Sequence, residues 1–182
     1  MIKTHVPQSP FLQNYIECFY VFNCESQFQF RYLAFSHCNR GFSFFKGVEI
    51  HRKDFQINVL ESIDLNVQLE LLGKHIKPLL IQYSVKNQEI SIVFKPFGIN
   101  RFLPKNYISF APSFSQEYTN SNWQLFGETL LESENRIESL EEFLLLPNFA
   151  ISLLSFRPSK PACLPAGKCG QIKKNDFVLN IK

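Results

Sequence analysis

The sequence predicts an α+β protein in which a β-sandwich or β-barrel comes first and a small helical unit follows. Short runs with alternating apolar residues fill the first hundred positions, and a helical period replaces them after about residue 120. The chain also contains 20 phenylalanines against one tryptophan and one methionine. Because phenylalanine favours half-buried pleated surfaces, this excess also indicates sheet.

Seven segments in the first half have the pattern of β-strands. In "EISIVF" the apolar residues Ile90, Ile92 and Phe94 alternate with other residues, and "NVQLELL" alternates in the same way. Polar or turn-forming residues separate the segments, which favours a sandwich or barrel over βαβ units. The predicted strands span residues 15–23, 28–35, 41–45, 55–60, 66–72, 79–85 and 89–94.

The last predicted strand runs into the sequence "KPFGINRFLP". Pro96 cannot donate a hydrogen bond to a sheet, so the strand is expected to end there. Gly98 is expected to adopt the positive φ that redirects the chain. "INRFL" then forms one helical turn, which Pro104 closes.

Two amphipathic helices are predicted after this junction, over residues 122–133 and 135–146. Asn135 is expected to cap the second helix and Pro147 to end it. The apolar faces consist of Trp123, Phe126 and Leu130 in the first helix and of Ile137, Leu140 and Leu144 in the second.

The composition changes in the last part of the chain. Residues 157–182 contain six Lys or Arg and one acidic residue, together with prolines and glycines that interrupt regular structure. The first 156 residues contain 13 basic and 15 acidic residues, a balance that does not indicate a nucleic-acid surface. We therefore predict a β-barrel over 1–110, a helical subdomain or connecting helix over 111–147, and an irregular tail over 148–182.

The segment "SIVFKPFGINRFL" resembles the strand and turn that close the cupin-like barrel in the N-terminal domain of AraC-family transcriptional regulators. Three further segments resemble the same family in the same order: "FLQNYIECFYVF", "WQLFGETLLES" and "NRIESLEEFLL". "HCNRGFSFFKG" loosely resembles the barrel hairpin, without the Pro-Asp/Asn-Gly turn often found there. The resemblance covers roughly residues 7–146 and implies a cupin-like antiparallel β-barrel with a sensing or dimerisation role.

The sequence departs from this family after residue 146. The family's DNA-binding domain has two helix-turn-helix units and needs about a hundred residues, whereas 36 residues follow Leu146. We therefore expect no direct, specific DNA binding by this chain. The change of composition near Phe156 leads to the hypothesis that residues 157–182 are not family sequence but the product of a truncation, frameshift or insertion.

A sensing barrel could enclose an apolar or aromatic small molecule as its effector. Aromatic residues would line such a site, and Arg31 or His37 would orient a polar group of the effector. The alternative is that the aromatic residues simply fill the interior, as a small barrel requires. The candidate ligand-binding residues are Arg31, Tyr32, His37, Phe42, Phe44 and Tyr83.

The apolar stripe of the second helix is a candidate dimerisation surface. Ile137, Leu140 and Leu144 either pair with a second copy of the chain, as the family's connecting helices often do, or pack against the barrel. A homodimer is therefore a candidate assembly.

Other classes of function are not supported by sequence motifs. No nucleophile elbow, P-loop or dinucleotide-binding motif is present, so we predict no catalytic residues and no enzyme activity. The four histidines never occur as His-x-His, so no metal site and no cofactor are predicted. The sequence contains no run of 18 apolar residues, so no membrane span is predicted. A cytoplasmic protein with reduced cysteines is expected. The alternative function is a stand-alone small-molecule-binding or protein-interaction barrel with no link to transcription.

Overall fold

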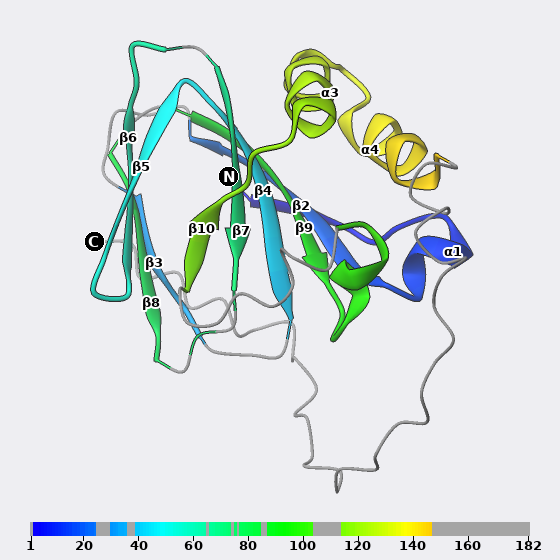
Figure 1. Ribbon diagram of the computed structural model, residues 1–182, viewed down its shortest axis with the longest axis horizontal. Coiled ribbons are helices and arrows are strands. Elements are labelled where there is room, and N and C mark those ends of the chain that lie inside the picture. Colours follow the sequence, from blue (N-terminus) through cyan, green and yellow to red (C-terminus); the bar gives the residue numbers. More distant parts are fainter. Residues whose placement is uncertain are drawn as a thin grey trace, which may run out of the picture.

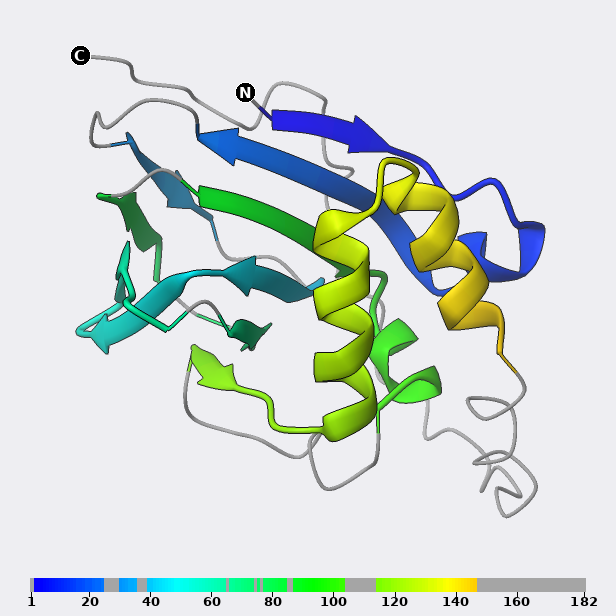
Figure 2. The same ribbon diagram turned by 90° about the horizontal axis from the view of Figure 1, so that it is seen from above.

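The computed structural model describes residues 2–24, 30–35, 39–64, 66–73, 75, 77–84, 87–103 and 114–146. Two β-sheets face each other, and helices cover the outer face of the larger sheet (Figure 1). The view from above shows the two longer helices lying across that face (Figure 2). The described part of the chain is therefore built of three layers: a four-stranded sheet, a six-stranded sheet and helices.

Ten strands form the two sheets. The six-stranded sheet has the order β1-β2-β9-β4-β7-β10 and the four-stranded sheet the order β3-β8-β6-β5. All seven predicted strands are confirmed to within two residues at each described end, and β1, β5 and β10 were not predicted. The strands are β1 (Ile2–His5), β2 (Ile16–Cys24), β3 (Phe30–Ala34), β4 (Arg40–Lys46), β5 (Val48–Lys53), β6 (Gln56–Glu61), β7 (Val67–Leu72), β8 (Leu79–Tyr83), β9 (Asn87–Phe94) and β10 (Ser115–Glu117).

The α+β class and the mainly antiparallel pairing are confirmed, but the predicted closed barrel is not formed. From β2 to β9 the chain passes back and forth between two sheets, and within the described residues no ladder joins one sheet to the other. One pair, β6 with β8, is parallel, with Ile57 opposite Ile81. An alternating pattern specifies a strand and its two faces, but it does not specify which strand edges meet.

The helices pack on the outer face of the six-stranded sheet, where they bury the larger of two apolar clusters. They are α1 (Pro10–Gln13), α3 (Ser121–Glu132) and α4 (Arg136–Leu145). The ring of Trp123 lies 4.7 Å from Phe42 and 5.9 Å from Phe44 between centroids. At Gly127 a Cβ atom would lie 2.8 Å from Val67 Cγ1, so a glycine allows α3 to approach the sheet closely.

The capping residue differs from the prediction. Asn120 caps α3, because its side-chain oxygen accepts hydrogen bonds from the backbone N–H groups of Asn122 and Trp123 at 3.1 and 3.2 Å. Asn135 precedes α4 but makes no such bond, and its φ of −101° and ψ of 52° are not the extended conformation from which a side chain caps.

The turn after β9 also differs in detail from the prediction. The positive φ, 63°, belongs to Phe97, and Gly98 is required for another reason. A Cβ atom on Gly98 would lie 2.0 Å from the carbonyl oxygen of Tyr15. The backbone N–H of Gly98 donates to the carbonyl oxygen of Lys95 at 2.8 Å, which closes the turn before the short 3₁₀ helix η1 (Gly98–Arg101).

The apolar stripe of α4 faces the sheet rather than solvent. Leu140 and Leu144 are 0% and 1% exposed, and Ile137 packs against the same cluster. Of the two alternatives for this stripe, packing within the chain is therefore the one observed. On the same helix, the Glu141 carboxylate accepts hydrogen bonds from the backbone N–H groups of Gln8 (2.7 Å) and Ser9 (3.0 Å), so α4 also holds the segment before α1.

The remaining predictions about organisation concern ranges that are only partly described. Strand β10 lies inside the range predicted to be a helical subdomain and pairs with β7. The predicted tail, residues 148–182, lies outside the described residues. None of the helices in the described part of the chain has the length and apolar character needed to cross a membrane.

Candidate functional site between the two sheets

Buried polar side chains lie between the two sheets. Successive strand residues point to opposite faces, so β9 places Ile90, Ile92 and Phe94 in the outer cluster and turns Glu89 and Ser91 toward the four-stranded sheet. Glu89 is 2% exposed and Ser91 is 0% exposed. The face that meets the second sheet, here called the inner face, is therefore partly polar although it is covered.

The cross-strand register lines up four of these side chains. Tyr20 on β2 is opposite Ser91 on β9, Ser91 is opposite Ser43 on β4, and Ser43 is opposite Glu70 on β7. The hydroxyl oxygens of Ser43 and Ser91 are 2.5 Å apart. We call Tyr20, Ser91, Ser43 and Glu70 the polar row; it crosses four adjacent strands of the inner face.

Glu89 lies next to the Tyr20 end of the polar row. The hydroxyls of Tyr20 and Ser91 donate to its Oε1 atom at 2.8 and 2.7 Å, and the Tyr83 hydroxyl donates to Oε2. Tyr83 belongs to β8, so this carboxylate links the two sheets. Burial, and then the charge of Glu89, raise the pKa of Tyr20, Tyr32 and Tyr83 above the ordinary value, so all three hydroxyls keep their protons, and those of Tyr20 and Tyr83 donate to Glu89.

Glu70 forms a second link at the other end of the polar row. Arg52, from β5 of the four-stranded sheet, donates from Nε to Oε1 at 2.9 Å and from Nη2 to Oε2. The Ser115 hydroxyl on β10 also donates to Oε1. Burial raises the pKa of Glu70 and Arg52 opposes that rise, whereas the hydrogen bond to Glu70 raises the pKa of Arg52. This link pairs opposite charges.

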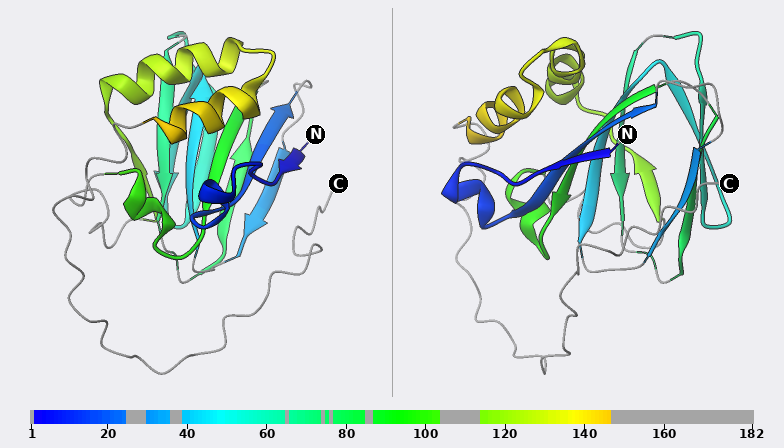
Figure 3. Two further views of the ribbon diagram at one scale, coloured as in Figure 1. Left: turned by 90° about the vertical axis from the view of Figure 1, so that its right-hand side faces the viewer. Right: turned by 180° about the vertical axis from the view of Figure 1, so that it is seen from behind.

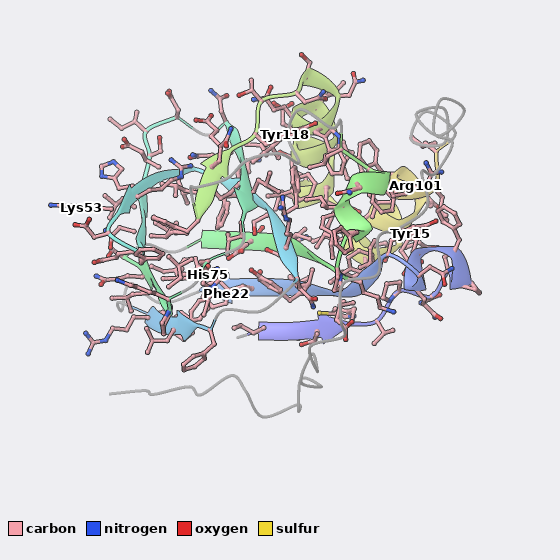
Figure 4. All side chains as sticks on the ribbon, turned by 60° about the horizontal axis from the view of Figure 1, so that its bottom comes forward. Tyr15, Phe22, Lys53, His75, Arg101 and Tyr118 are labelled. Atoms are coloured by element: carbon pink, nitrogen blue, oxygen red, sulfur yellow. The ribbon has the colours of Figure 1, made fainter. Side chains whose placement is uncertain are left out.

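An aromatic cluster surrounds the approach to Glu89. Its members are Phe22, Phe30, Tyr32 and Tyr83, from strands β2, β3 and β8. The Phe22 centroid lies 4.7 Å from Tyr83 and 5.1 Å from Phe30, and Tyr32 stacks on Tyr83 at 6.3 Å. Phe30 and Tyr32 are half-buried, so the cluster is partly exposed to solvent on this side. Figure 4 shows Phe22 at one end of the six-stranded sheet and Tyr15 at the other.

The structure brings together only some of the predicted ligand-binding residues. Tyr32 and Tyr83 lie in the aromatic cluster, while Arg31 is exposed on the outward face of β3. Phe42 and Phe44 do not line the space between the sheets. They lie on the opposite face beneath α3, because the helices cover that face with an apolar cluster. His37 lies outside the described residues.

The central residues of this site were not predicted. Tyr20, Ser43, Glu70 and Ser91 stand between apolar neighbours in a strand, as in "FSFF" and "LEL", a pattern that is typical of a strand with one face in water. Arg52, Glu89 and Ser115 have at least one polar neighbour, and Arg52 and Ser115 lie on the edge strands β5 and β10, so the sequence contained no signal for them. The missed residues are Tyr20, Ser43, Arg52, Glu70, Glu89, Ser91 and Ser115.

Two hollows on the described surface lie away from this site. One, of about 690 Å³, is bordered by β4 and α3 at Lys46 and Glu132. The other, of about 620 Å³, is bordered by Phe55 and Lys77. Neither is lined by the polar row or the aromatic cluster, whose side chains themselves occupy the space between the sheets.

The site combines a carboxylate held by neutral hydroxyls, an ion pair and accessible aromatic rings. Groups of these kinds can bind a polar ligand through hydrogen bonds and ring contacts. No protein-family model, curated protein or solved structure matches this chain.

Proposed function

We propose that this chain is a regulatory domain of the AraC type that binds a small-molecule effector between its two sheets, at the side bounded by the aromatic cluster. The proposal rests on one observation. The inner face carries hydrogen-bonding groups, including the 2%-exposed Glu89, at positions where apolar residues would hold two sheets together more simply.

The arrangement of the layers supports this proposal. Two facing sheets between which the chain alternates are the architecture of double-sheet jelly rolls, a class that includes the cupins. The outer face is occupied by α3 and α4, as seen from the side and from behind in Figure 3. An effector would then bind at the edge of the space between the sheets, where it would have to displace side chains of the aromatic cluster. The link to transcription rests on the sequence resemblance alone.

Differential scanning fluorimetry of the full 182-residue chain against a library of small metabolites tests this function. A ligand at about 100 times its Kd stabilises a protein by about 2.7 kcal/mol, which raises the Tm of a domain of this size by about 5–10 °C. We expect at least one compound to produce such a shift.

Two tyrosine variants show whether the compound binds between the sheets. Tyr83→Phe removes a hydroxyl that donates to Glu89, whereas Tyr15→Phe removes one near α1, where the Tyr15 ring lies 5.2 Å from that of Phe11. We expect the compound to raise the Tm of Tyr83→Phe by less than that of the wild type, and the Tm of Tyr15→Phe by as much. A library without a stabilising compound, or equal shifts in both variants, would instead indicate a purely structural role for the polar row.

A further inference from the structure

The charge of Glu89 is not balanced by a cation within the described residues. Its carboxylate receives hydrogen bonds from Tyr20, Tyr83 and Ser91, which are all neutral donors. The ion pairs recorded in the described part of the chain involve other acids, and Arg52 is taken up by Glu70. A buried carboxylate is stabilised far more by a positive charge than by hydroxyl groups.

The aromatic cluster adjoins this charge through two of its members, because Tyr83 donates to Glu89 and Phe22 is opposite Glu89 in the sheet register. The ring centroid of Phe30 lies 5.1 Å from that of Phe22, 5.9 Å from that of Tyr32 and 6.0 Å from that of Tyr83. The four rings therefore form one continuous cluster. Tyr83 belongs to that cluster and also bonds Glu89. Ring faces attract cations, and a set of aromatic rings is a known way for proteins to hold organic ammonium ions.

We propose that the site formed by Glu89 and the aromatic cluster binds an organic ammonium ion, with its positive nitrogen between the Glu89 carboxylate and the rings of Phe30 and Tyr32. Those two rings are half-buried and form the part of the cluster that is exposed to solvent. The inference rests on the proposed effector-binding function and adds the chemical class of the effector.

The electrostatics of the neighbouring phenols agree with this assignment. Burial, and then the negative charge of Glu89, raise the pKa of Tyr20, Tyr32 and Tyr83. An ammonium ion placed there would meet a negative potential in a region of low dielectric constant, where a single opposite charge interacts strongly. A neutral molecule of the same shape would gain only the ring contacts.

Isothermal titration calorimetry with choline, ethylammonium and dimethylbutanol tests the proposal. Dimethylbutanol has the shape of choline, but carbon replaces its positive nitrogen. We expect the full chain to bind at least one of the two ammonium ions, with a Kd at least tenfold lower than for dimethylbutanol. Sodium chloride at equal ionic strength controls for the effect of salt.

Three variants locate the binding. Glu89→Gln keeps the size of the side chain and removes its charge, so the preference for ammonium should disappear. Phe30→Leu keeps an apolar side chain at a half-buried position and should weaken ammonium binding several-fold. Glu132→Gln makes the same charge change on the surface of α3 and should leave binding unchanged. If Glu89→Gln does not fold, Phe30→Leu still decides the question.

Each result has a defined meaning. Failure of both ammonium ions to bind, equal binding of dimethylbutanol, or an unchanged preference in Glu89→Gln or Phe30→Leu overturns the ammonium assignment. If a neutral or anionic metabolite stabilises the chain through Tyr83 while the ammonium ions do not bind, the ammonium assignment fails and the proposed function stands. If no compound of any class binds, both fail.

Discussion

At the scale of single residues, the turn at the end of β9 places a bulky side chain where glycine is usual. Phe97 has a φ of 63° and is 84% exposed, whereas the neighbouring Gly98 lies against the backbone of Tyr15. A left-handed conformation costs a non-glycine residue about 1–2 kcal/mol. The two neighbours therefore respond to substitution in opposite directions.

We predict that Phe97→Gly stabilises the protein by about 0.5–1 kcal/mol, because the strain relieved exceeds the extra backbone entropy of glycine. We predict that Gly98→Ala destabilises it by about 1–3 kcal/mol or more, because its Cβ would lie 2.0 Å from the Tyr15 oxygen. Urea unfolding measures both values. A loss of stability in Phe97→Gly would show that the exposed ring contributes packing.

A second residue-scale prediction concerns the pH dependence of stability. Burial raises the pKa of Glu70 above its ordinary value of 4.5, so the folded chain holds this proton more tightly than the unfolded chain. The associated stability is fully present below pH 4.5 and is lost as the pH rises through the folded-state pKa. We therefore expect the free energy of unfolding of the wild type, relative to Glu70→Gln, to fall as the pH rises above about 4.5.

Glu132→Gln is the control for this titration. The hydrogen bond from Lys46 lowers the pKa of Glu132, so its contribution is present above pH 4.5 and is lost as the pH falls. Chemical unfolding at several pH values gives the free energy of unfolding of the wild type relative to each variant. As the pH rises, this value should fall relative to Glu70→Gln and rise relative to Glu132→Gln. If the free energy of unfolding of the wild type relative to Glu70→Gln instead increased with pH, Arg52 would lower the pKa of Glu70 by more than burial raises it.

At the scale of secondary-structure elements, the two longer helices begin in different ways. The side chain of Asn120 bonds two backbone N–H groups of α3, whereas Asn135 stands at the same position of α4 without capping it. The same residue type in the same place thus allows a direct comparison.

We predict that Asn120→Ala lowers the free energy of unfolding by about 1 kcal/mol, the usual loss when an N-cap side chain is removed. Asn135→Ala should change it by less than about 0.5 kcal/mol, as is usual for an exposed residue that caps nothing. Guanidinium unfolding monitored by circular dichroism measures both variants. Equal losses would contradict the assignment of the cap to Asn120 alone.

At the scale of the whole molecule, the six-stranded sheet separates an apolar cluster under the helices from a mixed cluster between the sheets. The stripe of α4 belongs to the first cluster, where it contributes to the stability of the folded chain. Leu140 is fully buried there, while Leu145 on the same helix is 45% exposed.

We predict that Leu140→Ala destabilises the protein by about 2–5 kcal/mol without changing its molar mass in solution. Leu145→Ala, the matched control, should change stability by less than about 0.5 kcal/mol. Thermal unfolding and multi-angle light scattering on the two variants provide the comparison. A lower molar mass in Leu140→Ala at unchanged stability would support the dimerisation alternative.

The sequence predicted most of the elements, but it was less informative about the site. Alternation located seven strands because each is a clear run, and the helical period located α3 and α4. It missed β5, whose "VEIHRK" is half charged, and the short edge strands β1 and β10, which carry little pattern. Tyr32 and Tyr83 were named as candidates, but Phe42 and Phe44 were assigned to the wrong side of the sheet.

The sequence by itself determined where seven of the described strands and the two longer helices lie and which of their side chains share a face, because these follow from periods of two and 3.6 residues. Only the tertiary structure decided what covers each face. Helices cover the largely apolar face of the six-stranded sheet, so Ser43, Glu70 and Glu89 lie between two sheets instead of in water. A strand whose polar face is in water and a strand whose polar face is covered by a second sheet have the same alternating pattern. The pattern specifies which residues share a face, but not what packs against that face.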